Sequence, residues 1–270
     1  MAIDQFIPEV WAAGVTQSFI ANQVVIPTLD NAFTGDVTAG NKVHIINATT
    51  PTIADYSATR TITAEALADT EVQLLIDQEK AFSVNVDDVD KVQASSEFGP
   101  WVDSAGRALA EDAENYVLDQ MLAGATNSNS GSIVVDTAAE ALTGVRAMRT
   151  AMGNAKVPAS NRYLAVSPDF ADLLIQGLDD VSVAGNDSEL RNGVIGRLYG
   201  FTVVETALVA TDAQSVGALA YHGSMVAFVN QIQSLESLRN PTKFSDIVRG
   251  LNVYGAKVLK SDAVYSYYSG

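Results

Sequence analysis

The sequence contains no cysteine, which excludes disulfide bonds, thiolate metal sites and cysteine nucleophiles. This composition fits a protein made in a reducing cytoplasm. Long apolar runs are also missing. The longest, Met225–Val229, has five residues, whereas a membrane-spanning helix needs about 20. The first residues, MAIDQFIPEV, have neither the basic nor the apolar region of a secretory signal. We therefore expect no membrane partner.

Charged residues are scarce, at 18% of 270 residues, and basic ones are the scarcer kind. The 16 Lys and Arg against 32 Asp and Glu give a formal net charge of −16. Residues 1–135 hold 19 acidic and 5 basic residues, whereas residues 136–270 hold 13 and 11. Phosphate binding needs clustered Lys and Arg, so the chain has no general electrostatic attraction for nucleic acid. A shortage of charge is also typical of surfaces that bind other chains.

No pattern of residues predicts catalysis. The two histidines, His44 and His222, lie far apart, and neither has a second imidazole or a thiol at ligand spacing. The glycines of 193–200 lack the Lys-Ser/Thr of a phosphate loop and lead into a strand, so we interpret them as turn glycines. The acidic run 87–90 lacks the glycine that a calcium loop requires. We expect no catalytic, cofactor-binding or metal-binding residue and no cofactor.

Hydrophobic periodicity predicts a long helix over Gly99–Gly124, with Pro100 at its first position and Trp101 on its apolar stripe. Glu114 is among the charged residues that avoid this stripe. Thr137 and Glu140 have the spacing of a capping box at the start of another helix. The further expected elements are helices over Pro8–Val25 and from Ser167 through Leu178, a loop at 127–132, and strands at 42–48, 71–86 (two), 163–166, 201–204, 218–221, 225–229, 248–258 and 263–268.

The stretch between the first two strands, 49–70, is polar and rich in threonine, with few large apolar residues. It cannot form a core of its own. It is either a disordered surface loop or a long two-stranded hairpin that packs against another subunit. Because an isolated hairpin is only marginally stable in water, the second reading requires a partner.

The order of these parts resembles the major capsid proteins of tailed bacteriophages, whose fold is shared with encapsulins and the herpesvirus shell floor. Four stretches carry the resemblance across nearly the whole chain. They are GNKVHIINA (40–48), VQLLIDQEKAFSVNVDDVDKVQA (72–94), NGVIGRLYGFTVVET (192–206) and the C-terminal pattern over 218–264 with its Val-Tyr-Gly step at 253–255.

The resemblance implies an α+β chain with the tailed-phage major capsid fold. The expected parts of that fold are an N-arm, an extended β-hairpin loop (E-loop), a long spine helix in a peripheral domain, and an axial domain. We place them at residues 1–30 (N-arm), 31–84 (E-loop), 85–132 with 225–270 (peripheral domain, spine helix about 100–123) and 133–224 (axial domain).

The resemblance also implies a function, which is self-assembly into an icosahedral virion shell around a phage double-stranded DNA genome, without specific DNA binding. The partners it implies are copies of the chain as hexamers and pentamers, together with scaffolding, portal and decoration proteins. Assembly is expected in the host bacterial cytoplasm. An encapsulin-type compartment shell and a soluble α/β enzyme are the alternatives.

The N-arm and the loop are the expected sites of contact between subunits, because both carry too few apolar side chains to be stable alone. Packing within their own subunit is the alternative. Arg60 is a candidate for an ion pair across the interface. The loop tip has no lysine, so we expect no covalent cross-link through it. The expected apolar anchors are Trp11, Phe19, Ile53, Tyr56 and Ile62.

Overall fold

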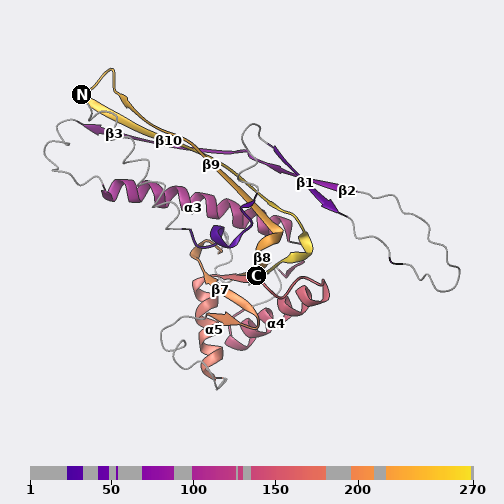
Figure 1. Cartoon of the computed structure of the whole chain (residues 1–270). Coiled ribbons are helices and arrows are strands. Elements are labelled where there is room, and N and C mark those ends of the chain that lie inside the picture. Colours follow the sequence, from indigo (N-terminus) through magenta and orange to yellow (C-terminus); the bar gives the residue numbers. More distant parts are fainter. Residues whose placement is uncertain are drawn as a thin grey trace.

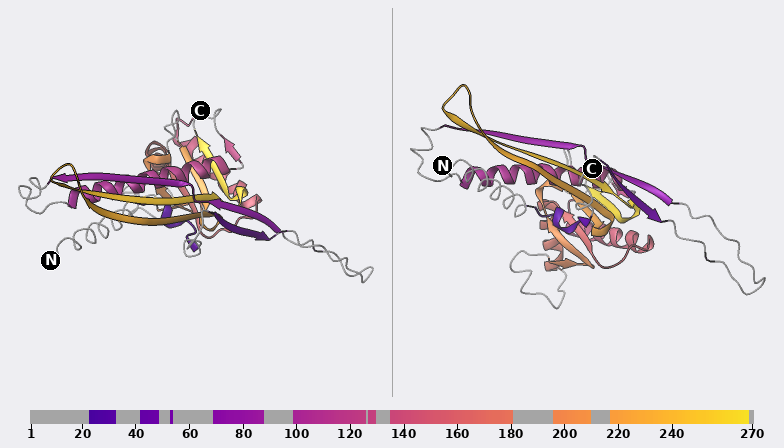
Figure 2. Two further views of the ribbon diagram at one scale, coloured as in Figure 1. Left: turned by 90° about the horizontal axis from the view of Figure 1, so that it is seen from above. Right: turned by 45° about the horizontal axis from the view of Figure 1, so that its top comes forward.

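The computed structural model describes residues 23–32, 42–48, 53, 69–87, 99–125, 127–129, 135–180, 196–209 and 217–268. They form an elongated body in which a long helix and long strands run side by side away from an α/β region (Figure 1). A two-stranded hairpin projects in the other direction (Figure 2). This mixture of helices and sheets confirms the predicted α+β class.

The long helix lies along a three-stranded antiparallel sheet with strand order β3-β10-β9. The elements are α3 (Gly99–Gly124), β3 (Gln78–Asp87), β9 (Val226–Arg239) and β10 (Ser245–Val258). The helix buries Ala110, Ala113, Val117 and Met121, whose spacing of three or four residues puts them on one face. This face shares a hydrophobic cluster with Tyr254 of β10. The predicted helix and the strand at 248–258 are confirmed.

The α/β region is built on a six-stranded mixed sheet with strand order β4-β11-β8-β5-β7-β6. Its strands are β4 (Asn127–Asn129), β5 (Arg162–Val166), β6 (Arg197–Leu198), β7 (Phe201–Glu205), β8 (Gly217–His222) and β11 (Val264–Tyr268), and its helices are α4 (Ala138–Asn154) and α5 (Pro168–Asp180). The side chains of Val145, Met152, Phe170 and Leu174 join the two helices to the sheet in one buried cluster. Strand β5 pairs parallel with β7 and antiparallel with β8.

Local sequence signals explain how these helices begin. The Thr137 side chain accepts from the backbone N–H of Glu140, whose carboxylate accepts in return, which confirms the capping box. Ser167 accepts at its Oγ from the N–H of Phe170 at 3.3 Å, immediately before α5. The turn between β6 and β7 has positive φ at Tyr199 (49°) and at Gly200 (88°). Gly200 is therefore a turn glycine, as the sequence predicted.

Several predicted details differ in the structure. Trp101 is 64% exposed, because it lies in the first turn of α3, at the end away from the α/β region. Glu114 is only 2% exposed, because backbone N–H groups of a distant segment bind its carboxylate. The polar stretch 127–129 is an edge strand rather than loop, because β11 supplies its pairing. Gln23–Val25 are not helical, since their chain instead turns into a 3-10 helix, η1 (Ile26–Thr28).

Candidate assembly surface

The projecting hairpin consists of β1 (Lys42–Ala48) and β2 (Asp69–Leu75), paired antiparallel from Lys42↔Leu75 to Ala48↔Asp69. It confirms the predicted strand at 42–48 and the first of the two strands expected at 71–86. Across the hairpin, exposed His44 contacts the Glu71 carboxylate through Nδ1. Ile53, which follows β1, is 96% exposed. A large apolar side chain that is this exposed is available to another molecule.

The base of the hairpin is seated on the body by a small hydrophobic cluster. Leu74 and Ile76 are 0% and 6% exposed, and with Val43 they pack against Ala227 and Val229 of β9. Alternation along β2 puts Leu74 on the body side, while its neighbour Leu75 is 44% exposed. The hairpin is therefore anchored at its base.

A network of polar and aromatic contacts joins α3 to β3, to β10 and to Asp77, which lies between β2 and β3. The Tyr254 hydroxyl donates to Asp112 Oδ2 at 2.5 Å, and Lys80 Nζ lies 3.3 Å from Asp112 Oδ1. Tyr116 packs edge-to-face on Tyr254, with ring centroids 5.6 Å apart, and donates to Asp77 Oδ1 at 3.1 Å. Burial, and then the charge of Asp77, raises the pKa of Tyr116 to about 12. The long helix, β3 and β10 thus form one stiff unit.

Two large aromatic side chains are exposed at the far end of this unit. Trp101, in the first turn of α3, is 64% exposed, and Phe244, in the turn between β9 and β10, is 80% exposed. The start of α3 and the β9–β10 turn lie at the same end of the molecule in both figures (Figures 1 and 2). Leu238, near the end of β9, is 42% exposed. Exposed aromatic residues on a rigid end are typical of a protein-binding surface.

The predicted contact residues divide into two groups. Ile53 is exposed, as a contact between subunits requires. Trp11, Phe19, Tyr56, Arg60 and Ile62 lie outside the described residues. Sequence analysis missed Phe244, although an aromatic residue after Pro241 in a turn was a visible signal. Trp101 was noted, but helical periodicity placed it on the buried stripe.

The described residues do not bring together the groups of an enzyme centre. No group of three or more His, Asp or Glu in this part of the chain is placed to hold a metal ion. His222 is 4% exposed, and burial lowers its pKa. None of the described helices combines the length and apolarity needed to cross a membrane.

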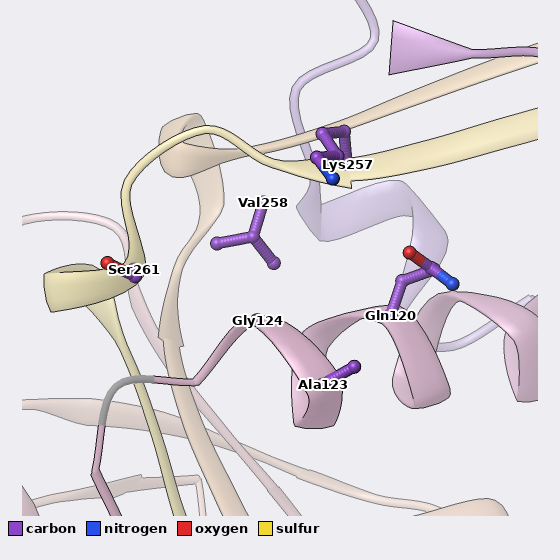
Figure 3. Close-up of a pocket in the computed structure, with 6 residues that line it drawn as sticks. All are labelled: Gln120, Ala123, Gly124, Lys257, Val258 and Ser261. Carbon is purple, nitrogen blue, oxygen red and sulfur yellow. The ribbon is translucent and has the colours of Figure 1, made fainter. Parts of the chain in front are cut away.

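A pocket of about 230 Å³ lies between the end of α3 and the corner after β10 (Figure 3). Lys257 is the only titratable side chain among the residues that line it, and the others are Gln120, Ala123, Gly124, Val258 and Ser261. A serine nucleophile needs a base within hydrogen-bond reach, and Lys257 and Ser261 lie on opposite sides of this pocket (Figure 3). The pocket therefore has no arrangement for catalysis.

A family model described as phage capsid protein matches residues 70–267. The chain belongs to this family. A solved structure from Mycobacterium phage Che8 is 33% identical, with a TM-score of 0.80 and 91% of each chain covered. This phage capsid protein therefore forms the shell of a virion, acts there as a structural component, and is not an enzyme. A comparison with curated proteins gave no match.

More distant solved structures share the fold of this capsid protein. The capsid of the cyanophage P-SCSP1u is 16% identical, with a TM-score of 0.71 and coverage of 87% of this chain and 85% of that one. A virus-like particle from Pyrococcus furiosus is 12% identical, with a TM-score of 0.63 and coverage of 96% and 98%. The overall fold of this chain is thus shared with proteins of other capsids and particles.

Proposed function

We propose that copies of this capsid protein assemble as hexamers and pentamers into an icosahedral shell that encloses the double-stranded DNA of a tailed phage. The match of the family model over residues 70–267 carries this proposal. Assembly takes place in the host bacterial cytoplasm, with scaffolding, portal and decoration proteins as further partners. In this proposal the chain divides into an N-arm (1–30), an E-loop (31–84), a peripheral domain (85–132 and 225–270) and an axial domain (133–224). Strands β4 and β11 fall within the bounds of the peripheral domain, but they pair in the same six-stranded sheet as the strands of the axial domain. They therefore link these two domains.

The exposed apolar residues provide the contacts between copies. Ile53 follows β1 of the projecting hairpin, whereas Trp101 and Phe244 belong to the start of α3 and the β9–β10 turn. These elements lie at opposite ends of the molecule (Figure 1), so the exposed residues on them meet different neighbours. Exposed ion pairs contribute about 0–1 kcal/mol each, whereas burying an apolar side chain of this size contributes about 1.5–3 kcal/mol. Apolar burial therefore dominates the affinity. The predicted anchors Trp11, Phe19, Tyr56 and Ile62, with Arg60 for an ion pair, complete the proposed contact set.

The negative charge of the protein suits a container for DNA. With a net charge of −16, the shell repels phosphate, which leaves the genome free to enter and leave. We expect weak binding of duplex DNA by the purified subunit. Tight binding that falls steeply with salt would contradict this part of the proposal.

Electron microscopy and light scattering of the purified protein test the proposal directly. Closed particles, or rings of six and five copies, are expected. A stable monomer with catalytic turnover would refute it. The contents of particles from infected cells decide between a virus shell and a compartment, since DNA protected from nuclease supports the first and protein cargo the second.

A further inference from the structure

We propose that Glu114 is a positioning residue for assembly, whose carboxylate clamps residues 24–26 to α3 and fixes where the N-terminal segment joins the folded body. The inference rests on the proposed role of the N-terminal segment in contacts between subunits. It concerns only described residues, which lie between α3 and the six-stranded sheet (Figure 1).

The clamp consists of three hydrogen bonds to one oxygen. Glu114 Oε1 accepts from the backbone N–H groups of Val24, of Val25 at 2.7 Å and of Ile26 at 3.4 Å. Val25 and Ile26 are 0% and 3% exposed, so water does not replace the bonds that these two residues donate. Val24 and Val25 precede the 3-10 helix and Ile26 begins it, so their N–H groups have no acceptor within that helix. Glu114 therefore supplies an acceptor that the local backbone lacks.

The position of Glu114 argues for a specific role. It stands among the buried residues Ala113, Val117 and Leu118 of α3, where an apolar side chain would satisfy the packing. A carboxylate buried without hydrogen bonds is strongly unfavourable, so this residue is tolerated only while the N-terminal segment is in place. The fold and the position of that segment are thereby linked.

The segment is fastened at two further points. Thr28 Oγ1 lies 2.6 Å from the Tyr221 hydroxyl of β8. Asp30 donates its N–H to Val226 O and accepts from the N–H of Phe228, both at 3.1 Å, so it forms a short parallel bridge with β9. Residues 24–30 thus touch α3, β8 and β9 in turn. A segment held on three elements enters the body at the same place in every copy, which lowers the entropy lost when copies associate.

Glu114→Gln tests the clamp, because glutamine keeps the shape of the side chain and removes its charge. Hydrogen exchange at the amides of residues 24–26 is expected to accelerate about tenfold or more. Particle yield at a fixed subunit concentration is expected to fall. Glu111→Gln makes the same change at an exposed position of α3 and should leave exchange and yield unaltered.

A variant that is destabilised elsewhere separates positioning from general stability. Met152→Ala creates a cavity in α4, far in sequence from the clamp. If Met152→Ala lowers the urea midpoint as much as Glu114→Gln and reduces particle yield equally, the positioning role is overturned. Faster exchange at 24–26 with unchanged particles would overturn it as well, and unchanged exchange would overturn the clamp itself.

Two measurements cover the case in which Glu114→Gln fails to fold. In the wild-type protein the amides of residues 24–26 must belong to the slowly exchanging class, and fast exchange there would overturn the clamp. Thr28→Val weakens the same segment without altering a buried charge, and it is expected to speed exchange over 24–30 and reduce particle yield. Failure of the wild-type protein to form particles would refute the proposed function, whereas the exchange data would still report on the clamp.

Discussion

Two glycines occupy points where separate segments of the chain touch backbone to backbone. A Cβ on Gly255 would lie 2.1 Å from the carbonyl oxygen of Leu75, where the hairpin joins the body. A Cβ on Gly223 would lie 2.3 Å from the carbonyl oxygen of Thr28 in the clamped segment. Neither contact can be relieved by a rotamer change, because backbone atoms are involved. Close approach therefore explains the glycine of the Val-Tyr-Gly step at 253–255.

Gly255→Ala is expected to lower the free energy of unfolding by about 1–3 kcal/mol, because the added methyl group pushes the hairpin base away from β10. Urea unfolding of the two proteins measures the difference. Gly153→Ala is the matched control, since nothing lies within 4 Å of its added Cβ. In α4 that change should be neutral or should stabilise by about 0.5–1 kcal/mol. Equal stabilities for Gly255→Ala and wild type would contradict the packing.

Two tyrosines, one half-buried and one buried, make the stability of the fold sensitive to alkali. Burial, with a contribution from Asp77, raises the pKa of Tyr116 to about 12, and burial together with Asp119 raises that of Tyr268 to about 12. In the unfolded chain tyrosine ionises near its ordinary value of 10.0. Between these values the unfolded state releases protons that the folded state retains, so the free energy of unfolding falls as pH rises.

Urea unfolding across this range is therefore expected to show full stability below pH 10 and a steady loss from there to about pH 12. Tyrosinate absorbance should appear together with unfolding. Tyr116→Phe is expected to make the pH dependence shallower, because one retained proton is removed. A pH profile that is flat from 10 to 12 would contradict the raised pKa of Tyr116 and of Tyr268.

At the scale of elements, the hairpin depends on one buried face at its base. Leu74→Ala removes a side chain that is 0% exposed and packed on β9, and we expect a loss of about 2–5 kcal/mol in the free energy of unfolding. Leu75→Ala changes the adjacent side chain, which is 44% exposed, and should cost much less. Hydrogen exchange over 42–48 and 69–75 measures whether the hairpin detaches. Similar effects of the two variants would contradict the one-sided burial.

At the scale of the whole molecule, assembly depends on apolar residues that the single chain leaves uncovered. Phe244→Ser is expected to raise the subunit concentration needed for particle formation about tenfold or more, since a buried phenylalanine contributes about 1.5–3 kcal/mol. The urea midpoint of the dissociated subunit should not change, because Phe244 is 80% exposed. Light scattering against concentration measures the threshold. Ala139→Ser, at an exposed position of α4, is the control, and an unchanged threshold for Phe244→Ser would remove this turn from the contact surface.

Local sequence signals by themselves determined most of the elements. The helix over Gly99–Gly124, the capping box at Thr137, the turn glycine at 200 and the strand patterns depend on neighbours a few residues away, so periodicity and turn chemistry predict them. The absence of cysteine and of basic clusters likewise restricted the chemistry before any fold was known. The family resemblance then supplied the order of the parts.

Only the tertiary structure decided which side chains are covered. Glu114 has the pattern of a surface charge, yet it is buried because a segment about 90 residues earlier brings three N–H groups to it. Trp101 has the pattern of a core residue, yet it is 64% exposed at the start of α3, at the end away from the α/β region. Strand β4 exists because β11 pairs with it. Contacts between residues distant in sequence leave no local pattern, because each partner is supplied by the folded chain.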